Sequence, residues 1–112
     1  MSCYLVELYT PNAEWKSLTI GLRRQFLEDI NNSMGSLSSM GVEILTLTEI
    51  QPGIDKSTKH RFLGIWHFPD AQTRNALLAG IKASGWYEYF DHVNVAGTDG
   101  DFAQHLRTLE NA

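Results

Sequence analysis

The chain has 112 residues, of which 43% are apolar and 20% charged, and its formal net charge is −4. This length and composition are typical of one globular domain and exclude a disordered chain, so residues 1–112 are expected to form a single domain. Lys and Arg do not cluster along the chain, and the acidic balance excludes the usual basic nucleic-acid-binding surface.

Cys3 is the single cysteine, so no internal disulfide is possible. We expect a reducing compartment and a buried thiol that packs like a small hydrophobic residue. The N-terminus has no basic segment followed by a short apolar run, and no stretch approaches the roughly 20 apolar residues of a membrane span. These features favour a cytoplasmic protein without membrane contact.

The first segment of the chain predicts a strand followed by a helix. Residues 3–9, CYLVELY, form a β-branched and aromatic run that stops at Pro11. Asn12 follows in a position that suits a helix N-cap.

A long apolar stripe then predicts the first helix. Apolar residues recur at steps of three and four from Trp15 to Met40, as on one face of an amphipathic helix. Polar and Gly residues within 31–35 weaken the stripe, and the sequence leaves open whether the helix continues through them. Gly41 is expected to end it in the left-handed conformation.

The middle of the chain predicts a hairpin. Residues 42–50 alternate apolar and polar side chains, and residues 61–68, RFLGIWHF, form another strand-like run. The segment 51–60 between them is rich in turn-forming residues and is longer than most hairpin loops.

The last part of the chain predicts helix, strand and helix. Asp70 is placed to cap a second helix that ends at Gly85, and residues 92–97, HVNVAG, read as a fourth strand. Asp101 is placed to cap a C-terminal helix over residues 101–110.

The order of these elements is βαββαβ with one added helix, which is the ferredoxin-like α+β arrangement. Its core is expected over residues 3–97. Right-handed crossovers predict a four-stranded antiparallel sheet in the order 4-1-3-2, with two helices on one face.

Alternation along the strands divides their side chains between the two faces of the sheet. One grouping places six aliphatic residues beneath the helices: Val6, Leu8, Leu63, Ile65, Val93 and Val95. The opposite face then carries Glu7, Tyr9, Phe62, Trp66, Phe68, His92 and Asn94. Such an aromatic face must be covered, and we expect a homodimer in which two sheets enclose a barrel. In the inverted grouping, Trp66 lies beneath the helices and His67 joins the pocket.

The element order, the segment GWYEYF at 85–90 and the strand HVNVAG resemble the dimeric α/β-barrel superfamily. That superfamily includes antibiotic-biosynthesis-type monooxygenases, EthD-like proteins and haem-degrading monooxygenases. The resemblance covers residues 3–97 and implies the fold and the dimer, whereas chemistry varies widely on one fold. The aromatic residues of 86–90 are expected to plug the end of the barrel or the dimer seam.

Glu7 and His92 are the candidate catalytic residues, because a carboxylate and an imidazole can serve as general base and acid. The candidate ligand-binding residues are Tyr9, Trp66, His67, Trp86 and Asn94. In the alternative interpretation Glu7 pairs across the dimer and only fixes its register, and His67 is a hydrogen-bonded core residue.

No metal or cofactor is expected. The four His are scattered without metal-ligand spacing. The resemblance to haem-degrading relatives implies a first-strand Asn and an axial His, but this chain has Glu7 in the first strand and no His in its second helix.

The sequence therefore predicts a dimer that binds a small, aromatic molecule in a pocket by the sheet, with cofactor-independent monooxygenase-like activity. The alternative is a non-enzymatic dimer with a packed barrel interior. A cavity above roughly 300 Å³ with Glu7 and His92 facing it favours the first function. An interior filled by Phe62, Trp66 and Phe68 favours the second.

Overall fold

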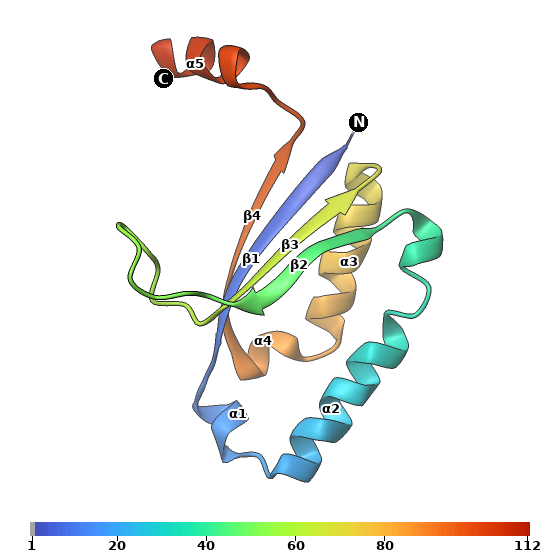
Figure 1. Ribbon diagram of the computed structural model, residues 1–112. Helices are drawn as coiled ribbons and strands as arrows, with labels where there is room; N and C mark the ends of the chain where they lie inside the picture. The colour runs from blue at the N-terminus through green and yellow to red at the C-terminus, as the bar shows by residue number, and fades with distance from the viewer. Residues whose placement is uncertain (1) are drawn as a thin grey trace.

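The structure, a computed structural model, describes residues 2–112 and has the predicted ferredoxin-like α+β fold. Its four strands form one antiparallel sheet in the order β2-β3-β1-β4, and helices α2 and α3 lie on one face (Figure 1). The strand bounds are β1 Cys3–Pro11, β2 Glu43–Glu49, β3 Phe62–Phe68 and β4 Phe90–Thr98. The order is the expected 4-1-3-2, which is compatible with right-handed crossovers.

The first helical region has two breaks, one within residues 31–35, where the sequence left the question open, and one at Leu18 that was not expected. Asn12 caps α1 (Ala13–Ser17), but the chain then extends at Leu18, and the Thr19 hydroxyl caps a second helix, α2 (Ile20–Ser33). Because α2 ends at Ser33, the helix does not continue through residues 31–35. A short 3₁₀ turn, η1 (Ser38–Met40), leads to Gly41, whose φ of 82° gives the expected left-handed end.

The second half follows the predicted caps. The Asp70 carboxylate accepts the Thr73 N–H at 2.7 Å and begins α3 (Ala71–Ala83), and Gly85 ends that region with a φ of 86°. A four-residue helix, α4 (Trp86–Tyr89), leads into β4.

The C-terminal helix, α5 (Phe102–Glu110), is capped by Asp101 as expected. It stands beyond the end of β4, away from the layer of α2 and α3 (Figure 1). None of its residues is buried. Among residues 2–112, no helix combines the length and apolar character that a bilayer crossing requires.

The core shows that the expected assignment of the sheet faces is wrong. The side of the sheet beneath the helices is the one that carries Leu5, Trp66 and Phe68, and these pack with Leu77 of α3. The aliphatic set instead lies on the open face, where Val93 and Val95 are 44% and 55% exposed. Because both faces of the sheet are apolar, alternation alone does not identify the one that the helices cover. The large rings of Trp66 and Phe68 occupy part of the space under the helices.

The aromatic residues of 86–90 pack within the chain against α1 and α2. The Trp15 ring lies 4.9 Å from the Phe90 ring and 5.7 Å from the Tyr89 ring, and Phe26 of α2 completes the cluster. Trp86 stacks on Phe90 at 4.0 Å. This segment therefore closes one end of the layer between the helices and the sheet, and not a space between two sheets.

Candidate functional site

A cavity of about 530 Å³ lies between the sheet and the helices. Its sheet side is formed by Glu7 and Tyr9 of β1, Leu47 of β2 and Trp66 of β3, and Trp86 of α4 lines one end. The helical side is formed by Leu27, Ile30, Ser33, Met34, Leu37, Ala76, Leu77, Gly80, Ile81, Ala83 and Ser84. The cavity exceeds the roughly 300 Å³ of a small-ligand pocket.

The composition of the two helices explains why this space stays open. None of the residues of α2 is buried, so this helix does not pack closely on the sheet. Where α3 faces the cavity it carries the small residues Ala76, Gly80 and Ala83. A methyl group added at Gly80 would have no heavy atom within 4 Å. The cavity is therefore a consequence of small side chains on one helix and a distant second helix.

Glu7 lies on the sheet side of the cavity, and its residue is only 4% exposed. The indole N–H of Trp66 donates to its Oε2 at 2.9 Å. Its other oxygen, Oε1, is buried and has no hydrogen-bond partner among the described residues. Gly64, opposite Glu7 on β3, makes room for this arrangement, since a Cβ there would lie 3.1 Å from Glu7 Oε2 and 3.3 Å from the Trp66 indole nitrogen.

His92 lies beside Glu7 in a chain of hydrogen bonds. Trp86 donates from its indole nitrogen to His92 Nδ1 at 3.1 Å, so the ring carries its proton on Nε2. Nε2 then donates to the Asn94 side-chain oxygen at 2.7 Å, and the Asn94 amide donates to the Tyr87 hydroxyl at 3.2 Å. The His92 ring also stacks on Tyr9, with centroids 5.6 Å apart.

Burial controls the charge of both titratable groups. It raises the pKa of Glu7 above its ordinary value, and the Trp66 hydrogen bond opposes this only in part. Burial lowers the pKa of His92, against the opposing hydrogen bond to Asn94. His92 is therefore neutral at neutral pH, as the bond from Trp86 also requires.

These contacts separate the roles that the two groups can have. Both ring nitrogens of His92 are engaged, so it orients its neighbours. Glu7 Oε1 lies 3.6 Å from His92 Nε2, beyond hydrogen-bonding distance, and is the basic atom that can take a proton or a hydrogen bond from a bound molecule.

A family model covers nearly the whole chain. DUF6616, described as a family of unknown function, matches residues 2–112. The chain belongs to this family. No curated protein matches it in sequence.

Solved structures show what the fold of this DUF6616 protein is similar to. A mutant chlorite dismutase from Candidatus Nitrospira defluvii aligns with a TM-score of 0.71 and 8% identity, over 90% of this chain and 41% of that chain. The Arabidopsis thaliana protein At3g17210 aligns with a TM-score of 0.60 and 8% identity, over 89% of this chain and 97% of that chain. A dimeric ferredoxin-like protein of unknown function from Thermobifida fusca aligns with a TM-score of 0.53 and 11% identity, over 88% of this chain and 92% of that chain.

These similarities support the ferredoxin-like fold and nothing finer. The DUF6616 chain spans less than half of the chlorite dismutase chain. At identities of 8–11%, the shared fold carries no shared chemistry.

The structure brings most of the sequence-predicted site residues together, although on the helix side of the sheet and not between two sheets. Glu7, Tyr9, Trp66 and Trp86 line the cavity, and His92 and Asn94 follow in the hydrogen-bond chain.

His67 lies apart from this group, on the open face. Its ring is 5.1 Å from that of Tyr4, and its Nδ1 is 2.9 Å from Glu43 Oε1. The expectation that it lies beneath the helices is wrong, for the same reason that the faces are inverted. Among residues 2–112, no three His, Cys, Asp or Glu side chains converge as metal ligands would.

Sequence reasoning missed Leu47 and the helical side of the cavity, and it also missed Gly64 and Tyr87. A Gly inside an otherwise bulky strand is a signal of close approach by other groups, and Gly64 fits that signal. No pattern in the sequence indicates that the Tyr87 hydroxyl meets Asn94.

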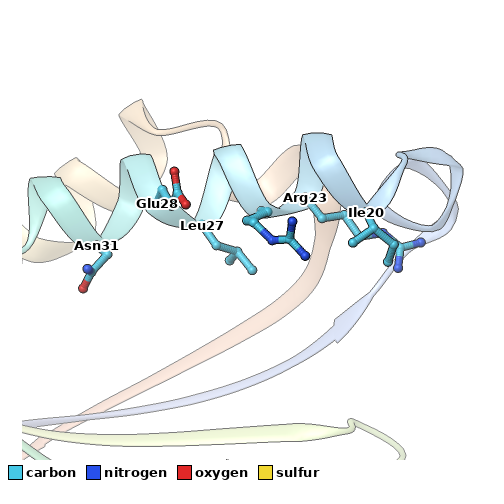
Figure 2. Close-up of a pocket in the computed structure, with 6 residues that line it drawn as sticks. Ile20, Arg23, Leu27, Glu28 and Asn31 are labelled. Carbon is cyan, nitrogen blue, oxygen red and sulfur yellow. The ribbon is translucent and has the colours of Figure 1, made fainter.

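A second hollow of about 400 Å³ runs along α2. Its lining residues are Ile20, Arg23, Arg24, Leu27, Glu28 and Asn31 (Figure 2). All six belong to one helix, so the hollow has no opposing wall. Leu27 also lines the main cavity, so the hollow lies beside that site.

Proposed function

We propose that this DUF6616 protein binds a small, largely apolar and aromatic molecule in the cavity between the sheet and α2 and α3. The observation that carries the proposal is Glu7 Oε1, a buried acceptor without a partner beside a cavity of about 530 Å³. An unpaired buried oxygen is costly in a packed core, whereas in a binding site the ligand can satisfy it. The rings of Tyr9, Trp66 and Trp86 suit the flat face of an aromatic ligand.

The reaction class that we propose is cofactor-independent and monooxygenase-like. A carboxylate with a raised pKa can remove the proton of an aromatic hydroxyl, and the resulting electron-rich anion can react with dioxygen. The cavity is apolar around Glu7, which keeps water from competing for that proton. Consumption of dissolved oxygen by the protein with a bound hydroxyaromatic compound would support this activity, and binding without consumption would leave a binding protein.

A cavity-filling substitution tests the binding function. Gly80→Leu extends a side chain into the cavity from a position with free space around it, and Leu suits a helix better than Gly. We expect the variant to keep or gain stability and to lose binding of 2-methoxynaphthalene, measured by calorimetry. Ala103→Leu adds a similar bulk in α5, far from the cavity, and should bind as the wild type does. If the wild type binds neither 2-methoxynaphthalene nor the related 2-naphthol and 2-naphthoate, the proposal fails.

We also propose that the chain forms a homodimer through its open sheet face. This face carries Val6, Leu8, Leu63, Ile65, Val93 and Val95. Four strands of seven to nine residues form a flat sheet of roughly 500 Å², and the protruding side chains add to this area. With the adjoining loops, such a face approaches the roughly 800 Å² per partner of a stable interface. The T. fusca protein is itself described as dimeric. Light scattering should give twice 12.6 kDa, and a monomer at working concentrations would overturn the dimer.

The two-fold assembly also accommodates the alternative function. The interior between two such sheets would be packed with aliphatic side chains, as a non-enzymatic dimer requires. The ligand cavity lies on the other side of each sheet, so the alternative stands only if that cavity binds nothing.

A further inference from the structure

We infer that the cavity selects ligands by a proton-donating group, a hydroxyl or an N–H, that bonds to Oε1 of Glu7. This inference rests on the proposed binding function and adds to it the chemical class of the ligand. It assigns to Glu7 the role of the specificity-determining residue.

The first step is the state of the two Glu7 oxygens. Oε2 is held by the Trp66 indole N–H at 2.9 Å, which fixes the plane of the carboxyl group. Oε1, the other oxygen of the group, is buried without a partner in residues 2–112. The side chain is 6% exposed and Glu7 belongs to the lining of the cavity, so the ligand that we infer bonds to Oε1 from the cavity side.

The second step is that the His92 ring, which lies beside Oε1, is committed to other partners. The Nε2 hydrogen of His92 points to Asn94 Oδ1 at 2.7 Å, and Nε2 is 3.6 Å from Glu7 Oε1. Nδ1 of the same ring accepts from Trp86 and cannot hold a second proton without losing that bond. Oε1 is therefore left for a donor from outside the chain.

The third step concerns the remainder of the ligand. The walls are mainly aliphatic and aromatic, and they include Leu47, Leu77 and Ile81 as well as the rings of Trp66 and Trp86. A ligand with an anionic group near Glu7 would place two negative charges in a site of low polarity. The site therefore fits a largely apolar molecule with one neutral donor, and disfavours carboxylates and ethers of the same shape.

A matched set of naphthalenes tests the inference, because its members differ only in one group. The probes are 2-naphthol, 2-methoxynaphthalene and 2-naphthoate, with affinities measured by calorimetry. The indole N–H resonance of Trp66, assigned with Trp66→Phe, reports whether each probe reaches the Glu7 site. We expect 2-naphthol to bind at least about tenfold more tightly than the ether, as a satisfied buried acceptor would give, and the naphthoate to bind most weakly.

Glu7→Gln is the decisive variant because it preserves the shape of the side chain. Trp66 would hold the amide oxygen, and the NH₂ group would face the cavity as a donor. The preference for 2-naphthol over 2-methoxynaphthalene should then fall below about threefold or reverse, with little loss of affinity for the ether.

The outcomes separate the two proposals. If the ether and 2-naphthol bind the wild type equally, or the naphthoate binds best, the donor selectivity is wrong although the cavity binds ligands. The selectivity is also wrong if Glu7→Gln leaves it unchanged. If none of the three probes binds, the proposed binding function fails and the inference fails with it.

Discussion

Trp66 donates a 2.9 Å hydrogen bond from its indole nitrogen to Oε2 of Glu7, across 59 positions of sequence. The bond joins the centres of β1 and β3 on the side of the sheet that faces the cavity. Gly64, directly opposite Glu7, leaves the space in which the two side chains meet. The carboxyl group is thereby fixed at one oxygen and available at the other.

Trp66→Phe tests the strength of this bond. The variant removes the indole donor to Glu7 Oε2 while it keeps an aromatic ring, so a buried carboxyl group loses this hydrogen bond. We expect the free energy of unfolding to fall by about 2–3 kcal/mol in urea denaturation. Trp86→Phe is the matched control, because it removes an indole N–H from the neutral acceptor His92 and should cost about 1 kcal/mol. A smaller loss for Trp66→Phe than for Trp86→Phe would contradict this assignment.

Glu7 predicts an unusual dependence of stability on pH. Its pKa is raised from 4.5 by burial, so between 4.5 and the raised value the folded state binds more protons than the unfolded state. The free energy of unfolding therefore falls as pH rises through that window, by at most about 1.4 kcal/mol per pH unit. Glu7→Gln should abolish this fall. Urea denaturation at a series of pH values from about 4.5 upward measures it.

His92 should make the free energy of unfolding change with pH in the opposite direction, which provides an internal control. Its pKa is lowered from 6.5, so below 6.5 the unfolded state binds more protons, and stability rises with pH up to that value. His92→Gln should remove this rise and leave the Glu7 contribution. Tyr9 also faces Glu7, but its pKa is raised above 10.0 and it does not titrate in this range. If the free energy of unfolding of the wild type and of Glu7→Gln changed with pH in parallel, the pKa of Glu7 would not be raised in the folded state.

Gly64→Ala should disturb both the fold and the site. The added Cβ would lie 2.8 Å from Leu47 Cδ2 and 3.1 Å from Glu7 Oε2, so these groups must move. We expect a loss of about 1–3 kcal/mol in the free energy of unfolding. Gly80→Ala is the control, since its Cβ meets nothing within 4 Å in a helix and should stabilise the protein by up to about 1 kcal/mol. Equal stabilities of the two variants would refute the close packing at Gly64.

Val95→Asp tests the proposed dimer. Val95 is 55% exposed on the open face, next to Val6 of β1 in the sheet. A carboxylate there is harmless in a monomer but would be unpaired and buried between two sheets. We expect light scattering to show a folded monomer for Val95→Asp and a dimer for Ile54→Asp, which alters an exposed residue of the loop between β2 and β3. An unchanged dimer in Val95→Asp would place the interface elsewhere.

Much of the candidate site could be predicted from strand alternation. Glu7, Tyr9, Trp66, His92 and Asn94 share one face because their positions in three neighbouring strands agree in register. His67 falls on the other face by the same rule, next to Trp66 in sequence. What alternation could not give is which face the helices cover, because either face is apolar enough to form a core.

The sequence by itself determined the order of the strands and many of the element ends, but not the break at Leu18. Asn12, Asp70 and Asp101 cap helices through their own side chains, and Gly41 and Gly85 supply left-handed turns, so each signal acts over a few residues. The handedness of the crossovers then fixed the strand order. Only the tertiary structure decided that the aromatic face packs beneath the helices, that α2 stands off to leave a cavity, and that His92 carries its proton on Nε2. These features depend on the volumes and hydrogen bonds of residues far apart in the chain, which no local pattern records.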